Sequence, residues 1–209
     1  GLCRIIAPNE GSGPVGVKRA LKPFLPTPAV VSTEKGLRYE KGKQSIGKVS
    51  AFYGNFGVYV KALAYIVTLG GKGLRASAET AVLNANYLRA RINEFYPVGE
   101  QRYCMHEFVL SMKKLKDETG VTALDVAKAL IDRGIHPPTM YFPLIVEEAL
   151  MFEPTETESK ENLDRAADAL REIIQEAYTA PEKLHTSPHN APVRRPDEVA
   201  AARNPVLRA

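Results

Sequence analysis

The hydrophobic positions in the second half of the chain switch between a period of two and helical spacing, which predicts a small α/β domain. Residues 106–112 alternate, with Phe108, Leu110 and Met112 on one face, as in a strand with one buried side. Residues 122–133 follow the helical period and predict a short helix. A change of period of this kind is typical of a strand followed by a covering helix.

Two more strands are predicted over 139–146 and 149–152. The first should be an edge or bulged strand, because Pro143 has no amide proton to donate to a neighbour. An amphipathic helix follows, and its start is expected at the capping-box pair Thr155 and Glu158. The order strand, helix, strand, strand, helix predicts a mostly antiparallel sheet covered by helices.

The first half predicts helices over 58–69 and 74–92, separated by Gly70 and Gly71. Before them, residues 51–57 form a turn rich in glycine and aromatic residues. This part therefore predicts two helical segments that meet at a glycine pair.

The two ends of the chain are expected to be irregular. Residues 11–31 are rich in glycine and proline, so no helix is expected there, and Val15 to Val17 could form a short strand. Residues 32–50 are polar and are compatible with a hairpin around Lys35 and Gly36. From Thr179 onward the chain has five prolines and no period, which predicts an extended tail.

The composition is that of an ordinary globular protein, with 44% hydrophobic and 25% charged residues. No apolar run is long enough to cross a bilayer, and two cysteines, Cys3 and Cys104, do not make a disulfide framework. A cytoplasmic protein without membrane contact is therefore expected. The net charge of +4 is modest, and the basic tail has no aromatic residue after Tyr178, which argues against nucleic-acid binding.

Residues 11–16 match the pattern G-x-G-x-x-G of dinucleotide-binding loops. Such a loop needs a helix that opens within the glycines, and Pro23 would stop a helix here after less than two turns. A phosphate loop of the Walker type is also excluded, since Val17 stands where its lysine should follow Gly16. A tight glycine turn is the remaining interpretation.

Two further features leave alternatives open. The turn at Tyr53, Gly54 and Asn55 precedes a helix, so its amide groups could bind a phosphate, or Asn55 could simply cap the helix. His106 and His136 each open a predicted strand and could meet at one edge of the sheet. No histidine pair has the spacing of a helical metal site, so no metal is expected.

Eight segments occur in one order along the chain, and together they closely resemble the C-terminal part of the pyridoxal-phosphate-dependent glycine decarboxylases. These are the P-proteins of the glycine cleavage system, and subunit 2 of the two-subunit bacterial form is the most similar. The resemblance covers roughly residues 11–208. The matching segments are 11–18, 24–26, 45–47, 53–57, 81–87, 106–110, 136–139 and 153–156.

The resemblance implies the C-terminal portion of a fold-type-I pyridoxal-phosphate enzyme. It implies an oxidoreductase, glycine dehydrogenase, that decarboxylates glycine and passes the aminomethyl group to the lipoyl arm of the H-protein, with pyridoxal phosphate as cofactor. The implied partners are subunit 1 and the H-protein, in an oligomer. The alternative is a non-catalytic module that docks subunit 1 or the H-protein.

The same resemblance implies the division of the chain. Its parts are the end of the large cofactor domain at 1–70, with an atypical leader at 1–10, a linking helix at 71–95, a small α/β domain at 96–178, and a proline-rich basic tail at 179–209.

Residue roles also follow from the resemblance alone. The lysine that holds the cofactor as an aldimine would lie upstream of Gly1, so the 209 residues alone are expected to be inactive. The expected cofactor-binding residues are Gly11, Ser12, Gly13, Tyr53, Gly54 and Asn55, and those of the substrate cleft are His106, His136 and Thr139.

Overall fold

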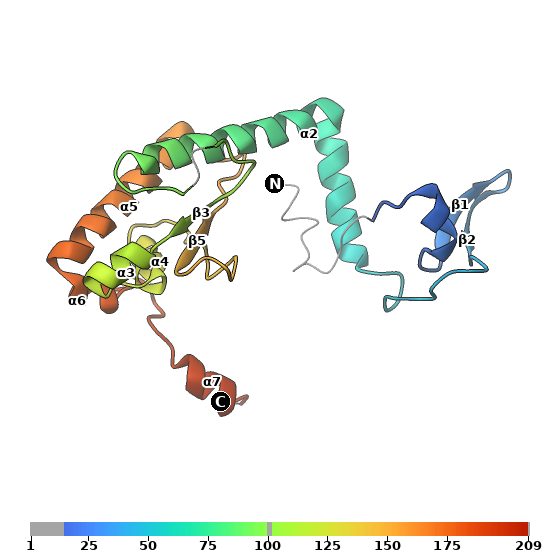
Figure 1. Cartoon of the computed structure of the whole chain (residues 1–209). Coiled ribbons are helices and arrows are strands. Elements are labelled where there is room, and N and C mark those ends of the chain that lie inside the picture. Colours follow the sequence, from blue (N-terminus) through green and yellow to red (C-terminus); the bar gives the residue numbers. More distant parts are fainter. Residues whose placement is uncertain (1–14, 100–101, 209) are drawn as a thin grey trace. The chain divides into compact units, whose positions relative to one another are not determined.

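The computed structural model describes residues 15–99 and 102–208, and the chain divides into two compact units, Gly1–Arg75 and Ala76–Ala209 (Figure 1). The expected cofactor residues Gly11, Ser12 and Gly13 lie outside the described residues. The helix α2, Phe56–Asn93, runs from the first unit into the second. Each unit is described by itself below.

The first unit contains the expected hairpin. Strands β1 (Ala29–Thr33) and β2 (Gly36–Glu40) pair antiparallel, and Thr33 lies opposite Gly36, so Glu34 and Lys35 form a two-residue loop. Gly36 has a φ of +100°, which L-residues rarely adopt and glycine adopts readily. The glycine in the turn signal is therefore needed for the hairpin.

Two expectations for the proline-rich start are wrong. Val15 to Val17 form no strand, and Arg19–Phe24 form a short 3₁₀ helix, η2, with Pro23 inside it. The amides of Leu21 and Leu25 donate to the carbonyls of Lys18 and Lys22. Because these bonds do not use the missing amide proton of Pro23, the proline is compatible with so short a helix.

The break predicted between two helical segments is present inside α2. Gly70 has φ 60° and ψ −179°, outside the helical region, and helical turns continue on both sides of it. A residue with a side chain would be strained in this conformation, so the glycine allows the kink.

The second unit contains a three-stranded antiparallel sheet of order β3-β5-β4. Strands β3 (Phe108–Ser111) and β5 (Ala149–Phe152) agree with the sequence pattern. The strand predicted over 139–146 is shorter, since β4 covers only Thr139–Met140. Tyr141, at φ +57°, and the following Pro143 end the pairing there.

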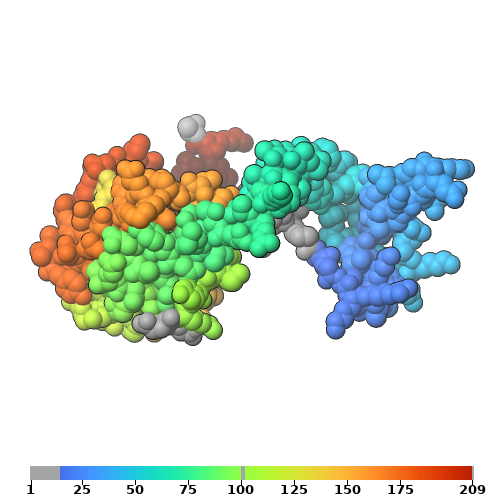
Figure 2. Space-filling view, turned by 90° about the horizontal axis from the view of Figure 1, so that it is seen from above, coloured from blue at the N-terminus to red at the C-terminus, as the bar shows by residue number. Residues whose placement is uncertain are grey.

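Helices cover this sheet, which confirms the predicted α/β class. The helix α4, Ala123–Asp132, begins at a capping box between Thr122 and Asp125. The helix α3, Lys113–Thr119, was not predicted from the sequence. The second half of α2 lies beside α5, Lys160–Thr179, on the face seen in Figure 2, and Tyr87 and Asp164 join them.

The capping box predicted at Thr155 and Glu158 is wrong. The helix α5 begins at Lys160, two residues after Glu158, and its cap is Ser159, whose Oγ accepts the amide of Asn162 at 3.2 Å. The carbonyls of Thr155 and Glu158 instead accept the side-chain amide of Asn84 at 2.8 and 3.1 Å. A contact from a distant helix therefore shapes this segment and delays the helix start.

The tail is not extended throughout. It forms α6, Pro181–His185, and α7, Glu198–Arg203. Leu184 and Pro188 are buried, so the first part of the tail belongs to the core of the second unit. Arg195 then holds the chain to α4 through its 2.7 Å contact with Asp125.

The two units differ sharply in how much apolar surface they bury. Among the described residues of the first unit, only Val58 is a buried hydrophobic side chain. The second unit has a continuous core drawn from α2, the sheet and α3 to α6. The largest fully buried side chains of this core include Ile92, Leu110, Met112, Leu115, Leu130, Leu150, Leu170, Ile173 and Leu184.

Candidate functional site

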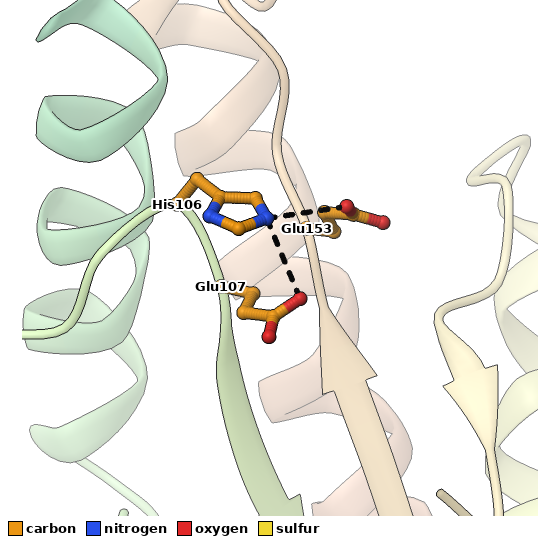
Figure 3. Close-up of side chains that lie close together, drawn as sticks. All are labelled: His106, Glu107 and Glu153. Carbon is orange, nitrogen blue, oxygen red and sulfur yellow. Dashed lines mark ion pairs between the residues drawn. The ribbon is translucent and has the colours of Figure 1, made fainter. Parts of the chain in front are cut away.

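A cluster of one histidine and two glutamates lies at the end of the sheet where β3 begins. Phe108 at the start of β3 pairs with Phe152 at the end of β5, and their rings stack at 5.3 Å. His106 and Glu107 therefore enter β3 at the point where Glu153 leaves β5 (Figure 3). The antiparallel register brings residues 46 positions apart in sequence to one place.

The three side chains point toward one another (Figure 3). Nε2 of His106 lies 3.6 Å from Oε2 of Glu107 and 3.6 Å from Oε1 of Glu153. These distances are longer than a hydrogen bond, and each side chain is 38–40% exposed. An exposed ion pair at this distance contributes little to stability, about 0–1 kcal/mol.

The second helical half of α2 fixes the segments on both sides of this cluster. Asn86 accepts the amide of Cys104 at 3.0 Å and donates to its carbonyl at 2.8 Å, two residues before His106. Asn84 donates to the carbonyl of Thr155, two residues after Glu153. The sequence-based reasoning assigned no role to either asparagine, although an amide within the apolar pattern of a helix is a signal for such a contact.

The other expected cleft residues, His136 and Thr139, belong to the same end of the sheet. Because β4 runs antiparallel to β5, the segment that precedes it starts where β5 ends. Thr139 is the first residue of β4, and both side chains are exposed. The strand β5 separates this segment from His106, and the role of these residues in a cleft stays a prediction.

The turn at Tyr53 to Asn55 lies in the first unit. The ring of Tyr53 stacks on Tyr39 of the hairpin at 5.0 Å, and the ammonium of Lys48 lies 5.7 Å from its centroid. The carbonyl of Asn55 accepts the amides of Val58 and Tyr59 and so opens α2. The turn is thus an aromatic and basic corner directly before a helix start.

Gly54 is required by the shape of this turn. It has a φ of +86°, and a Cβ added there would lie 2.1 Å from Oη of Tyr59. The side chain of Tyr59 therefore explains the glycine, without reference to a ligand.

A separate polar cluster, around Asp125, holds the tail in place. Burial by itself would raise the pKa of Asp125. Hydrogen bonds from Thr122 and the guanidinium of Arg195 outweigh this effect and hold the pKa of this carboxyl below its ordinary value. Nδ1 of His185 also lies 3.1 Å from the carboxylate.

Comparison with solved structures identifies the fold. The chain is similar to the crystal structure of glycine decarboxylase (P-protein) of the glycine cleavage system in inhibitor-bound form, with a TM-score of 0.58 and 22% identity. The likeness covers 76% of this chain and 38% of the other. At this identity it establishes the shared fold, in agreement with the predicted α/β class.

The sequence comparisons then define the family. A family model described as "Glycine dehydrogenase, C-terminal domain" matches residues 77–196, so the chain belongs to the glycine dehydrogenase family. A "Probable glycine dehydrogenase (decarboxylating) subunit 2" of Treponema denticola is 57% identical over 201 residues, which are 96% of this chain and 42% of the relative. A protein of the same name from Caldanaerobacter subterraneus is 58% identical over 204 residues, 96% of this chain and 41% of the relative.

These matches confirm the resemblance drawn from the eight segments. The chain spans about two-fifths of the length of the curated relatives that it matches. Among the helices of residues 15–99 and 102–208, none is long and apolar enough to cross a membrane.

Proposed function

We propose that this chain supplies the C-terminal part of an enzyme that decarboxylates glycine with pyridoxal phosphate and passes the aminomethyl group to the lipoyl arm of the H-protein. The observation that carries the proposal is the identity of 57% to a glycine dehydrogenase subunit 2 over 96% of the chain. The expected partners are subunit 1, the H-protein and a second copy of the enzyme, in the cytoplasm.

The described residues of the first unit fit an anionic cofactor. This unit has eleven lysines and arginines between residues 15 and 75 and only two acidic residues, Glu34 and Glu40. Lys48 lies beside Tyr53, and the amide end of α2 follows Asn55. A helix start next to a cation suits a phosphate group, so Tyr53, Gly54 and Asn55 are proposed to border it, with Gly11, Ser12 and Gly13.

Pyridoxal phosphate, when bound, supplies the electron sink that allows the carboxylate of glycine to leave. The residues of this chain are proposed to position and enclose the reacting groups. His106, His136 and Thr139 would border the cleft that admits glycine and the lipoyl arm.

The first unit leaves a large apolar surface to be covered. Its exposed apolar side chains come from the hairpin, the following loop and the first half of α2. So much exposed apolar surface is unusual for a unit that is stable without a partner. Since the relatives are more than twice as long as the chain, the proposed cover is the part of the enzyme absent from these 209 residues. The exposed residues include Val30, Leu37, Tyr39, Ile46, Val49, Phe52, Phe56, Leu63 and Val67.

The 209-residue chain by itself is therefore proposed to be inactive, and a chimera tests the function. In subunit 2 of Treponema denticola, this chain would replace the matching C-terminal two-fifths. Release of carbon dioxide from carboxyl-labelled glycine is then measured with pyridoxal phosphate, subunit 1 and lipoylated H-protein. Turnover by the chimera is expected, and none by this chain alone or by the parent subunit truncated at the same point.

A folded chimera that binds pyridoxal phosphate yet releases no more carbon dioxide than the truncated parent would contradict the proposal. If this chain nevertheless retained subunit 1 or the H-protein in a pull-down, the alternative of a non-catalytic docking module would replace it.

A further inference from the structure

The cluster of His106, Glu107 and Glu153 has the features of a cation site that the sequence does not reveal. One atom from each residue, an imidazole nitrogen and two carboxylate oxygens, can be chosen so that all three lie within 4.8 Å of one another. Imidazole and carboxylate are the donors that divalent zinc accepts together in proteins. The sequence-based expectation of no metal considered only the spacing of histidines along the chain, and Glu153 is brought in by the sheet.

The spacing of the donors is close to that around a metal. Zinc binds imidazole nitrogen and carboxylate oxygen at about 2.0–2.2 Å, so two ligands of a tetrahedral ion lie roughly 3.3–3.6 Å apart. Nε2 of His106 is 3.6 Å from one oxygen of each carboxylate, Oε2 of Glu107 and Oε1 of Glu153. This gap is too wide for a good hydrogen bond, and the three donor atoms, all within 4.8 Å of one another, would have to close by at most about 1.5 Å around an ion.

The backbone that carries the donors is fixed from both sides. Pairing of Phe108 with Phe152 sets the separation of the two strands. Asn86 clamps the chain before His106, and Asn84 clamps it after Glu153. Because such contacts hold the ligand residues in position, the backbone would need little rearrangement when the ion binds.

We propose that His106, Glu107 and Glu153 bind one divalent cation of the zinc class. Nε2 and the two carboxylates would supply three ligands, and the partial exposure of the side chains leaves a further position for water. The ion would join the start of β3 to the end of β5. His106 is also a proposed cleft residue, so the ion would lie at the border of that cleft, but its binding is measured without decarboxylase activity and is tested separately from it.

Cobalt(II) replaces zinc in such sites and gives visible absorption, so it is a direct probe. The untagged 209-residue chain is titrated with CoCl₂, and displacement by ZnCl₂ is followed. One equivalent of Co²⁺ is expected to give a visible band that Zn²⁺ removes. His106→Ala, Glu107→Gln and Glu153→Gln are each expected to weaken Co²⁺ binding by more than about tenfold, since even partners outside the ligand shell account for about 10–100-fold.

His136→Ala is the matched control. This histidine precedes β4 at the same end of the sheet, is exposed, and lies outside the three-residue cluster, so its loss should leave Co²⁺ binding unchanged. Circular dichroism of each variant checks that it is folded. Two results would overturn the proposal. One is the absence of a Co²⁺ band at millimolar metal. The other is a band that the three substitutions leave unaltered while His136→Ala removes it.

Discussion

The Asp125 cluster allows the sharpest prediction, because one buried carboxylate serves a helix cap and a tail anchor together. Its side chain is only 4% exposed. It accepts the amide and hydroxyl of Thr122 at 2.8 Å each, and the guanidinium of Arg195 at 2.7 Å. Asp125→Ala removes these three bonds and the 3.1 Å contact with Nδ1 of His185, and it leaves the donors of Thr122 and Arg195 without this acceptor.

The magnitude follows from these contacts. Asp125 is the N3 residue of the capping box, so its loss removes the bonds from the amide and hydroxyl of Thr122, at about 0.5–1.5 kcal/mol, while Thr122 still caps the amide of residue 125. Loss of a charged hydrogen bond costs roughly 1.5–3 kcal/mol, and the lower end applies because the side chain of Arg195 is 31% exposed and partly solvated. Asp125→Ala is therefore expected to lower the free energy of unfolding of the second unit by about 2–4 kcal/mol. Arg195→Ala leaves the cap intact and should cost roughly half as much.

Urea denaturation of the whole chain, with hydrogen exchange of peptides from α4 and from residues 186–196, measures both effects. Asp125→Ala should speed exchange in both segments, whereas Arg195→Ala should affect the tail more than α4. Asp117→Ala is the control, because Asp117 is an exposed acid paired only at the surface with Lys113, worth about 0–1 kcal/mol. A loss below about 1 kcal/mol for Asp125→Ala, or equal losses for Asp117 and Asp125, would refute the reasoning.

Three further predictions concern titration, a glycine and an asparagine. Because the pKa of Asp125 is lower in the folded state, its carboxylate contributes stability above its unfolded pKa, and this contribution is lost as the pH falls through the folded pKa. Asp125→Asn should therefore make the free energy of unfolding fall less steeply with decreasing pH. Urea denaturation at several pH values below 5 would measure this. Gly54→Ala should destabilise the turn before α2 by about 1–3 kcal/mol. Adding Tyr59→Phe, which removes the clashing hydroxyl, should restore part of the melting temperature; no recovery would mean that the strain at φ +86° accounts for the whole loss. Asn86→Ala should cost about 1–3 kcal/mol and raise hydrogen exchange at Cys104, and unchanged exchange there would count against the clamp.

The elements with a strong local signal were predicted from the sequence. The alternation of Phe108, Leu110 and Met112 gave β3, and all three side chains are buried. The glycine pair marked the kink of α2, because a φ near +60° at Gly70 favours glycine in any context. The hairpin turn at Gly36 follows from the same property.

The failures lie where distant contacts override local signals. Thr155 and Glu158 have the spacing of a capping box, but Asn84 donates to their carbonyls, and α5 is capped by Ser159 and begins at Lys160 instead. The tail has no hydrophobic period, yet Leu184 is buried against the core. A few buried residues, Leu184, Ser187 and Pro188, and the contact of Arg195 with Asp125 fix this segment, and none of them produces a period along the chain.

The candidate site also has a part that the sequence predicted and a part that only the structure shows. The sequence named His106, His136 and Thr139 through the resemblance, and their membership of one sheet end depends on the order β3-β5-β4. Glu153 as a neighbour of His106 could not be inferred from spacing, since the paired strand ends beside them, Phe108 and Phe152, are 44 positions apart.

The sequence by itself determined the family and the elements with a strong hydrophobic period, because identity along the chain and hydrophobic period are properties of neighbouring residues. Only the tertiary structure decided that Glu153 faces His106 and that Arg195 reaches Asp125, 70 positions away. Long-range pairs depend on strand register and helix packing, which arise from the burial of the whole core and leave no local trace.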